Sequence, residues 1–123
     1  MFSNKLINYG SQFIDDMDVK QVSKTLVSSY LTQGPYVDLF ESNLKSFFKS
    51  KYAIALSSGT SALHIGIKSL KLKKDSSVIT TPLTFISTAS SILMNGLRPV
   101  FSDIEKTSLT LDPNKVEDQI KKN

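Results

Sequence analysis

Apolar residues in the N-terminal part of the chain recur at helical spacing. A first predicted helix carries them at Val19, Val22, Leu26 and Tyr30. Asp15 and Asp16 precede it and offer the side-chain oxygens that cap a helix N-terminus. Gln33-Gly34-Pro35 should break this helix and open a second one. The second helix has one apolar stripe that we expect to pack in a core: Val37, Phe40, Leu44, Phe47 and Phe48.

After Lys51 the pattern changes to short apolar runs that alternate with helical segments. The runs predict three buried strands, at 52–56, 78–81 and 99–101. Helices are predicted after 60, at 85–94 with a stop at Asn95-Gly96, and from Asp112-Pro113 onward. Strands that alternate with helices predict an α/β sheet with right-handed crossovers. The chain ends in helix-like sequence and three strands leave open edges, so we expect it to be the truncated start of a larger domain.

The sequence that follows the first predicted strand suggests an anion site. Ser57-Ser58-Gly59-Thr60 stands between that strand and a helix. A helix N-terminus has unpaired N–H groups and the positive end of the helix dipole, and both attract phosphate. The same residues are also typical of a simple capping motif. Phe85 follows the next strand and could offer its ring to a ligand at the same sheet edge, or it could be a buried helix-start residue.

Composition narrows the classes of function. The 123 residues are 40% hydrophobic and 21% charged, with no apolar run long enough to span a membrane and no cysteine for a disulfide, thiolate metal site or nucleophile. We expect a cytoplasmic protein without a metal site. The net charge of +4 comes mostly from scattered lysines, and the cluster at Lys71, Lys73 and Lys74 is best interpreted as a solvated loop rather than a nucleic-acid patch. The excess charge suits an anionic ligand such as a nucleotide sugar.

Several segments, in order, resemble the DegT-type sugar-nucleotide aminotransferases, which use pyridoxal 5'-phosphate. The resemblance spans nearly the whole chain and lies in Ile7-Asn8-Tyr9-Gly10, Leu31-Thr32-Gln33-Gly34-Pro35, Ser57 to His64, Thr80-Thr81-Pro82-Leu83-Thr84-Phe85, and Gly96 to Phe101 with Asp103. It implies the type I aminotransferase fold, a three-layer αβα arrangement, with residues 1–123 as the N-terminal segment of the large domain. Residues 31–34 with Thr80-Thr81-Pro82 most resemble the subgroup of UDP-4-amino-4,6-dideoxy-N-acetyl-beta-L-altrosamine transaminases, which act in pseudaminic acid biosynthesis.

The resemblance also implies roles for particular residues. Gly59, Thr60 and Ser61 would hold the cofactor phosphate, and Phe85 would stack on the pyridine ring. The sugar-nucleotide site would be lined by Tyr9, Tyr30, Leu31 and Thr32. His64 also matches a residue common in the family. We interpret it as structural, because it lies beyond the first helical turn and no second histidine exists.

One essential residue of the family is missing. Transamination needs a lysine that forms a Schiff base with the cofactor, and no lysine here occupies the matching position. We therefore expect a longer parent protein to move an amino group, with glutamate as the expected donor, to a 4-keto-6-deoxy sugar nucleotide. The parent would be a homodimer, and this chain alone would be inactive. Two alternatives stay open: a dehydratase-type relative with histidine in place of the lysine, or a non-catalytic binding module or remnant.

Overall fold

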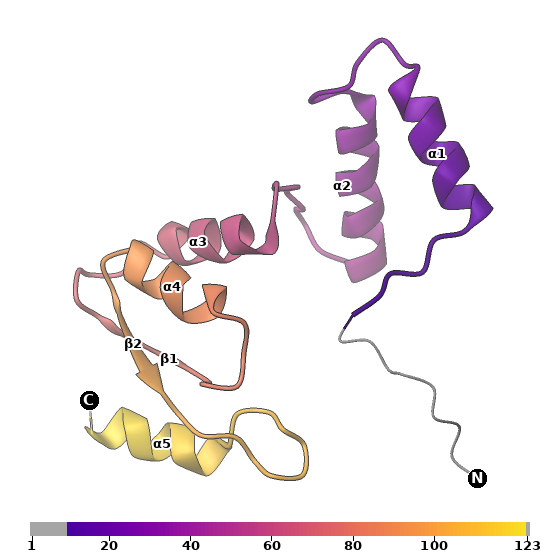
Figure 1. The fold of residues 1–123 in the computed structure, drawn as a ribbon. Coiled ribbons are helices and arrows are strands. Elements are labelled where there is room, and N and C mark those ends of the chain that lie inside the picture. Colours follow the sequence, from indigo (N-terminus) through magenta and orange to yellow (C-terminus); the bar gives the residue numbers. More distant parts are fainter. Residues whose placement is uncertain (1–9, 123) are drawn as a thin grey trace, which may run out of the picture. The chain divides into compact units, whose positions relative to one another are not determined.

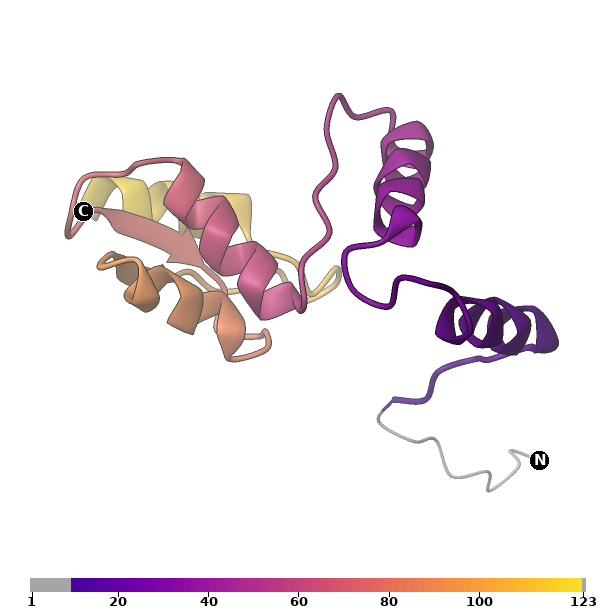
Figure 2. The same ribbon diagram turned by 90° about the horizontal axis from the view of Figure 1, so that it is seen from above.

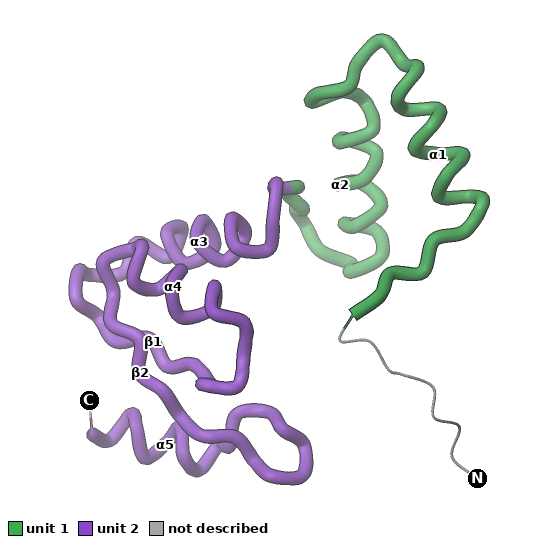
Figure 3. Tube along the Cα trace, in the orientation of Figure 1, with its two compact units in different colours: residues 1–55 green, residues 56–123 purple. Residues whose placement is uncertain are grey.

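The computed structural model describes residues 10–122 and divides into two compact units, residues 1–55 and 56–123 (Figure 3). The first unit contains helices α1 and α2. The second contains α3, β1, α4, β2 and α5 (Figure 1). Among the described residues, no helix combines the length and the apolarity needed to cross a membrane.

Helix α1, Asp16–Leu26, begins where the two aspartates predicted it. Asp15 Oδ1 accepts the N–H groups of Met17 at 2.9 Å and Asp18 at 3.1 Å, and Asp18 Oδ2 accepts the N–H of Asp15 at 3.1 Å. This reciprocal capping box satisfies backbone donors that the first helical turn leaves open. The helix ends before Tyr30, the last residue of the predicted apolar pattern, and Ser28 Oγ instead donates to the carbonyl of Tyr30 at 3.0 Å.

Helix α2, Pro35–Phe48, starts at the predicted break, with Gly34 as its N-cap and proline in its first position. Its apolar stripe does form on the helix, but the expectation that the stripe packs in a core is wrong for the described chain. Val37, Phe40, Phe47 and Phe48 are exposed. The physical reason is that no described element of the first unit covers them. Phe47 and Phe48 instead contact each other edge to face, with ring centres 4.9 Å apart.

The predicted strand at 52–56 is also wrong, since this segment forms no ladder with another strand. Side chains satisfy some of its backbone groups instead. Glu41 Oε1 accepts the N–H of Ala55 at 2.7 Å, and Ser50 Oγ donates to the carbonyl of Tyr52 at 2.9 Å. An apolar run becomes a strand only when a partner strand supplies ladder bonds, and none of the described segments pairs with it.

The second unit is built on a parallel pair of strands, β1 (Ser77–Thr80) and β2 (Arg98–Phe101). Ser77 pairs with Arg98 and Thr80 with Phe101. Helix α4, Ser87–Met94, is the crossover between them, as the alternating pattern predicted. It packs against both strands and against α3, Gly59–Ser69 (Figures 1 and 2).

The core of this unit is small and lies under α4. Ile92 is 2% exposed and Leu97 is 6% exposed, and the polar residues Ser87, Ser91, Thr80 and Ser102 are also buried. The predicted stop at Asn95-Gly96 is confirmed, because α4 ends at Asn95 and Gly96 adopts a φ of +68°. The loop that leads from α3 to β1 exposes Lys71, Lys73 and Lys74, in agreement with the solvated-loop interpretation.

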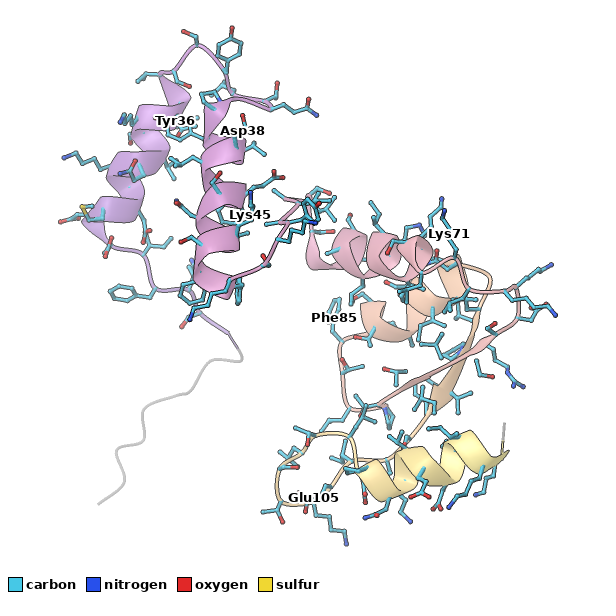
Figure 4. The ribbon with its side chains drawn as sticks, turned by 180° about the vertical axis from the view of Figure 1, so that it is seen from behind. Tyr36, Asp38, Lys45, Lys71, Phe85 and Glu105 are labelled. Carbon is cyan, nitrogen blue, oxygen red and sulfur yellow. The ribbon has the colours of Figure 1, made fainter. Side chains whose placement is uncertain are left out.

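A tight turn follows β2 and leads into α5, Pro113–Lys122. Ile104 and Leu111 form an isolated antiparallel bridge across the turn. Glu105 lies in it, partly exposed, and its carboxylate accepts the N–H groups of Thr107 at 3.0 Å and Ser108 at 2.6 Å (Figure 4). Asp112 then caps α5 through the N–H of Asn114 at 2.9 Å, as predicted.

The stability of this turn should decrease in acid, because Glu105 becomes protonated. Hydrogen bonding from the Ser108 hydroxyl, and then from the N–H groups of Ser108 and Thr107, lowers the pKa of Glu105 from 4.5 to about 2. A lowered pKa in the folded state means that the carboxylate stabilises the turn above pH 4.5 and loses this effect as the pH falls toward 2. A carbon-detected NMR titration should therefore give a Glu105 midpoint well below 4.5, and Glu105→Gln should remove the matching shifts of the Thr107 and Ser108 amides. A midpoint near 4.5 would contradict the hydrogen-bonded turn.

Candidate functional site

Three of the four predicted cofactor residues line one open cavity of about 620 Å³ in the second unit. Gly59 and Thr60 come from the start of α3, and Phe85 comes from the loop before α4. The remaining lining residues were not singled out in the sequence: Ala62, Leu63, Ser87 and Thr88. Helices α3 and α4 lie side by side with their N-terminal ends directed the same way, so both helix starts face this space (Figures 1 and 2).

The first turn of α3 leaves two backbone donors unused. Ser58 caps the helix, because its Oγ accepts the N–H of Ser61 at 3.1 Å, and its carbonyl accepts the N–H of Ala62 at 3.1 Å. Within residues 10–122, the N–H groups of Gly59 and Thr60 have no acceptor. The motif is thus a capping motif and a potential anion site at once, so the two interpretations of the sequence do not exclude each other.

Gly59 and Ser61 differ in what they can offer. A Cβ added at Gly59 would meet no atom within 4 Å, so the space beside this residue is open to a ligand. Ser61 is committed to the cap: its N–H goes to Ser58, and its Oγ lies 3.0 Å from Ser58 Oγ and 3.3 Å from Ser57 Oγ. Ser61 is also absent from the cavity lining, so an anion there would be held chiefly by residues 59 and 60.

Phe85 presents an open aromatic ring to this space. Its side chain is 69% exposed, so it is not the buried helix-start residue that the sequence left as an alternative. Figure 4 shows it in the loop that leads into α4, at the end of the unit where α3 begins. Thr84 Oγ1 and Thr88 Oγ1 lie 2.9 Å apart across the first turn of α4 and tie this loop to the helix. A flat ligand could therefore stack on the ring while an attached phosphate reaches the free amides.

The predicted sugar-nucleotide residues lie in the first unit, except that Tyr9 is outside the described residues. Tyr30, Leu31 and Thr32 form an exposed bend between α1 and α2. Leu31 lines a mostly apolar hollow of about 440 Å³, together with α1 residues and Tyr36 of α2. Tyr30 and Thr32 are not part of its lining.

The bend depends on Gly34. A Cβ at this position would lie 2.7 Å from Tyr30 Cβ and 3.2 Å from the Tyr30 carbonyl oxygen, which is closer than packed atoms approach. The sequence flagged Gly34 as a helix breaker, whereas its close contact with Tyr30 could be found only in the structure.

His64 contacts Asn95, a residue that the sequence marked only as a helix stop. Asn95 Nδ2 donates to the carbonyl of His64 at 3.0 Å and lies 3.3 Å from His64 Nδ1. This contact joins α3 to α4 and agrees with a structural role for His64.

The chain belongs to the DegT/DnrJ/EryC1/StrS aminotransferase family, whose model matches residues 12–123. It is 40% identical over 118 residues to the UDP-4-amino-4,6-dideoxy-N-acetyl-beta-L-altrosamine transaminase of Campylobacter jejuni, a match that covers 96% of the chain and 31% of that relative. The chain spans less than a third of the length of the curated relatives it matches.

Solved structures of relatives share the fold. Helicobacter pylori PseC, an aminotransferase involved in the biosynthesis of pseudoaminic acid, matches with a TM-score of 0.84 and 34% identity over 93% of this chain and 31% of that one. Escherichia coli GDP-4-keto-6-deoxy-D-mannose-3-dehydratase, with bound hydrated pyridoxal phosphate, matches with a TM-score of 0.82 and 31% identity over 93% of this chain and 31% of that one. These matches confirm the predicted fold class, the α/β type I aminotransferase fold.

Gly34→Ala should distort the bend at Tyr30, because the added methyl group overlaps the Tyr30 side chain and backbone. We expect a loss of about 1–3 kcal/mol in local stability, seen as faster hydrogen exchange at residues 30–36. Gly66→Ala is the matched control, since its methyl group meets open space within α3 and should stabilise that helix by about 0.5–1 kcal/mol. Equal exchange in Gly34→Ala and the unsubstituted chain would contradict the close contact.

Proposed function

We propose that residues 1–123 are the N-terminal segment of the cofactor-binding large domain of a pyridoxal-phosphate-dependent sugar-nucleotide aminotransferase. The observation that carries this proposal is the cavity in which Gly59, Thr60 and Phe85 meet, with two unpaired amides on one side and an exposed ring on the other. Membership of the aminotransferase family supports it.

The residues of the cavity fit the cofactor chemically. The N–H groups of Gly59 and Thr60, the Thr60 hydroxyl and the positive end of the α3 dipole would hold the phosphate group. The Phe85 ring would face the pyridine ring and fix its plane. The cofactor, when bound, supplies the electron sink that lets an amino group leave one substrate and join another. Residues 59, 60 and 85 therefore bind and orient, and no reacting atom belongs to them.

The lining of the described cavity contains no lysine. We propose that the lysine needed for transamination comes from downstream residues of a longer protein, here called the parent protein, and that the 123-residue chain alone is inactive. We call the N–H groups of Gly59 and Thr60, the Thr60 hydroxyl and the Phe85 ring the cofactor cradle. Its donors are neutral amides and a hydroxyl, so they can hold the cofactor but do not act as the base that moves its protons.

We propose a UDP-linked 4-keto-6-deoxy sugar as the amino acceptor and glutamate as the donor. The similarity to a UDP-sugar transaminase and to an aminotransferase of pseudoaminic acid biosynthesis supports the acceptor. Tyr9 and the bend at Tyr30, Leu31 and Thr32 would contribute to the sugar-nucleotide site, and the parent protein would be a homodimer.

A dehydratase is the second candidate function. The structural similarity to the Escherichia coli sugar-nucleotide dehydratase supports it. Both candidates require the same cofactor cradle, so residues 1–123 do not separate them. The downstream residue at the position of the catalytic lysine does: lysine supports transamination, and histidine supports dehydration.

One assay of the parent protein decides between the candidates. We would incubate it with pyridoxal phosphate, a UDP-linked 4-keto-6-deoxy sugar and glutamate, and identify the product by mass spectrometry. Formation of an amino sugar and 2-oxoglutarate is expected. Loss of water from the sugar without gain of nitrogen would support the dehydratase, and absence of bound cofactor would refute both.

Thr60→Val should weaken retention of pyridoxal phosphate by the parent protein. The substitution keeps the shape of the side chain but removes a hydroxyl donor to a charged group, which is worth about 1.5–3 kcal/mol, or about tenfold or more in Kd. Thr60→Ser keeps the hydroxyl and should bind within a few-fold of the unsubstituted protein. If cofactor titration gives Thr60→Val and Thr60→Ser the same Kd, Thr60 does not contact the phosphate.

A further inference from the structure

Asn95 is the C-cap residue of α4, and its side-chain amide contacts both α4 and α3. Nδ2 donates to the carbonyl of Ser91 at 2.8 Å and to the carbonyl of His64 at 3.0 Å, and it lies 3.3 Å from His64 Nδ1. The first contact is within α4, and the other two reach α3. Asn95 is partly buried, so these bonds are partly shielded from water.

The two carbonyl oxygens determine which way the Asn95 amide points. If the amide were turned over, its oxygen would face two other oxygens and none of the three could donate. With Nδ2 toward the carbonyls, both of its hydrogens have acceptors. The bond to His64 uses a main-chain atom, and therefore survives any change of the imidazole.

Helix α3 has few other contacts that determine its position. None of its residues is buried. Among the described elements it packs chiefly against α4, and the hydrogen bonds between the two helices in residues 10–122 are those of Asn95 with His64. The placement of α3 against α4 thus depends on side chains of α3 that are not fully buried and on the Asn95 amide.

The spacing of residues connects this amide to the cavity. Thr60 and His64 are four residues apart and lie on one face of α3, while Thr88 and Asn95 are seven residues apart and share a face of α4. Thr60 and Thr88 line the cavity, and His64 and Asn95 meet further along the helices. A tilt of α3 about the Asn95 contact would therefore change the separation of Thr60 from the loop that carries Phe85.

We propose that Asn95 is a positioning residue for the cofactor cradle: its amide holds α3 against α4 and so fixes the free amides of Gly59 and Thr60 relative to the Phe85 ring. This role rests on the proposed function. Asn95 itself is not among the residues that line the cavity. Small displacements of the groups that orient a reacting molecule lower binding and reaction rates strongly. Loss of a residue that holds these groups in place should therefore be measurable in cofactor binding.

The test compares the parent protein with three variants, using pyridoxal phosphate as the probe. Asn95→Ala removes all the amide contacts, and Asn95→Asp keeps their shape but turns carboxylate oxygens toward two carbonyls. Both should weaken cofactor binding by about fivefold to tenfold and shift the absorbance maximum of the bound cofactor. His64→Ala should retain most of the affinity, because the main-chain acceptor at position 64 remains.

Ile92→Val is the control for a purely structural effect. It removes one methylene from a buried side chain of α4 and should lower thermal stability, while the Asn95 amide and its acceptors at His64 and Ser91 stay in place. Its cofactor Kd and absorbance maximum should equal those of the unsubstituted parent. If Asn95→Ala and Ile92→Val have the same Kd at similar unfolding temperatures, the positioning role is refuted.

A second measurement separates this inference from the proposed function. Hydrogen exchange of the cofactor-free protein should quicken at residues 61–68 in Asn95→Ala and not in Ile92→Val, whether or not pyridoxal phosphate binds. Failure of the unsubstituted parent to bind the cofactor would overturn the proposed function. Unchanged exchange in α3 of Asn95→Ala would overturn the role of Asn95 as the support of that helix.

Discussion

Parallel pairing of β1 with β2 is the constraint on which the second unit depends. Parallel strands cannot be joined by a tight turn, so the chain must cross back through α4, which packs against both strands and carries the buried Ile92. Helix α3 then packs on α4. The two helices run in the same direction, so their N-terminal ends border one cavity (Figures 1 and 2). A ladder of four residue pairs thus determines where α4 lies, and with it the α4 side of the cavity.

The cavity combines two kinds of recognition without a charged side chain in its lining. Amides and a hydroxyl at residues 59 and 60 supply directional donors, and Phe85 supplies a flat apolar surface. Ser58 contributes indirectly, because by capping Ser61 it leaves the two preceding N–H groups as the ones available to an anion. These features suit a phosphate attached to an aromatic ring, which is the chemical form of the cofactor that we propose.

The sequence predicted those parts of the fold that depend on neighbouring residues. The caps at Asp15 and Asp112, the break at Gly34-Pro35 and the stop at Asn95-Gly96 follow from local chemistry, and all are confirmed. The strand at 52–56 and the buried stripe on α2 were wrong, because pairing and burial require partners that the described chain does not provide. The cradle could be proposed from residues 57–60, but its meeting with Phe85 and the bond from Asn95 to His64 depend on the packing of α3 on α4.

The unpaired donors at the start of α3 belong to the main chain, and this affects how the site can change during evolution. Most side-chain replacements at positions 59 and 60 would leave the N–H groups where they are, and only proline would delete one of them. Amides also do not titrate in the physiological range, so the donor side of this attraction for an anion does not vary with pH. The donors at the start of α3 can therefore stay constant while the side chains around them change.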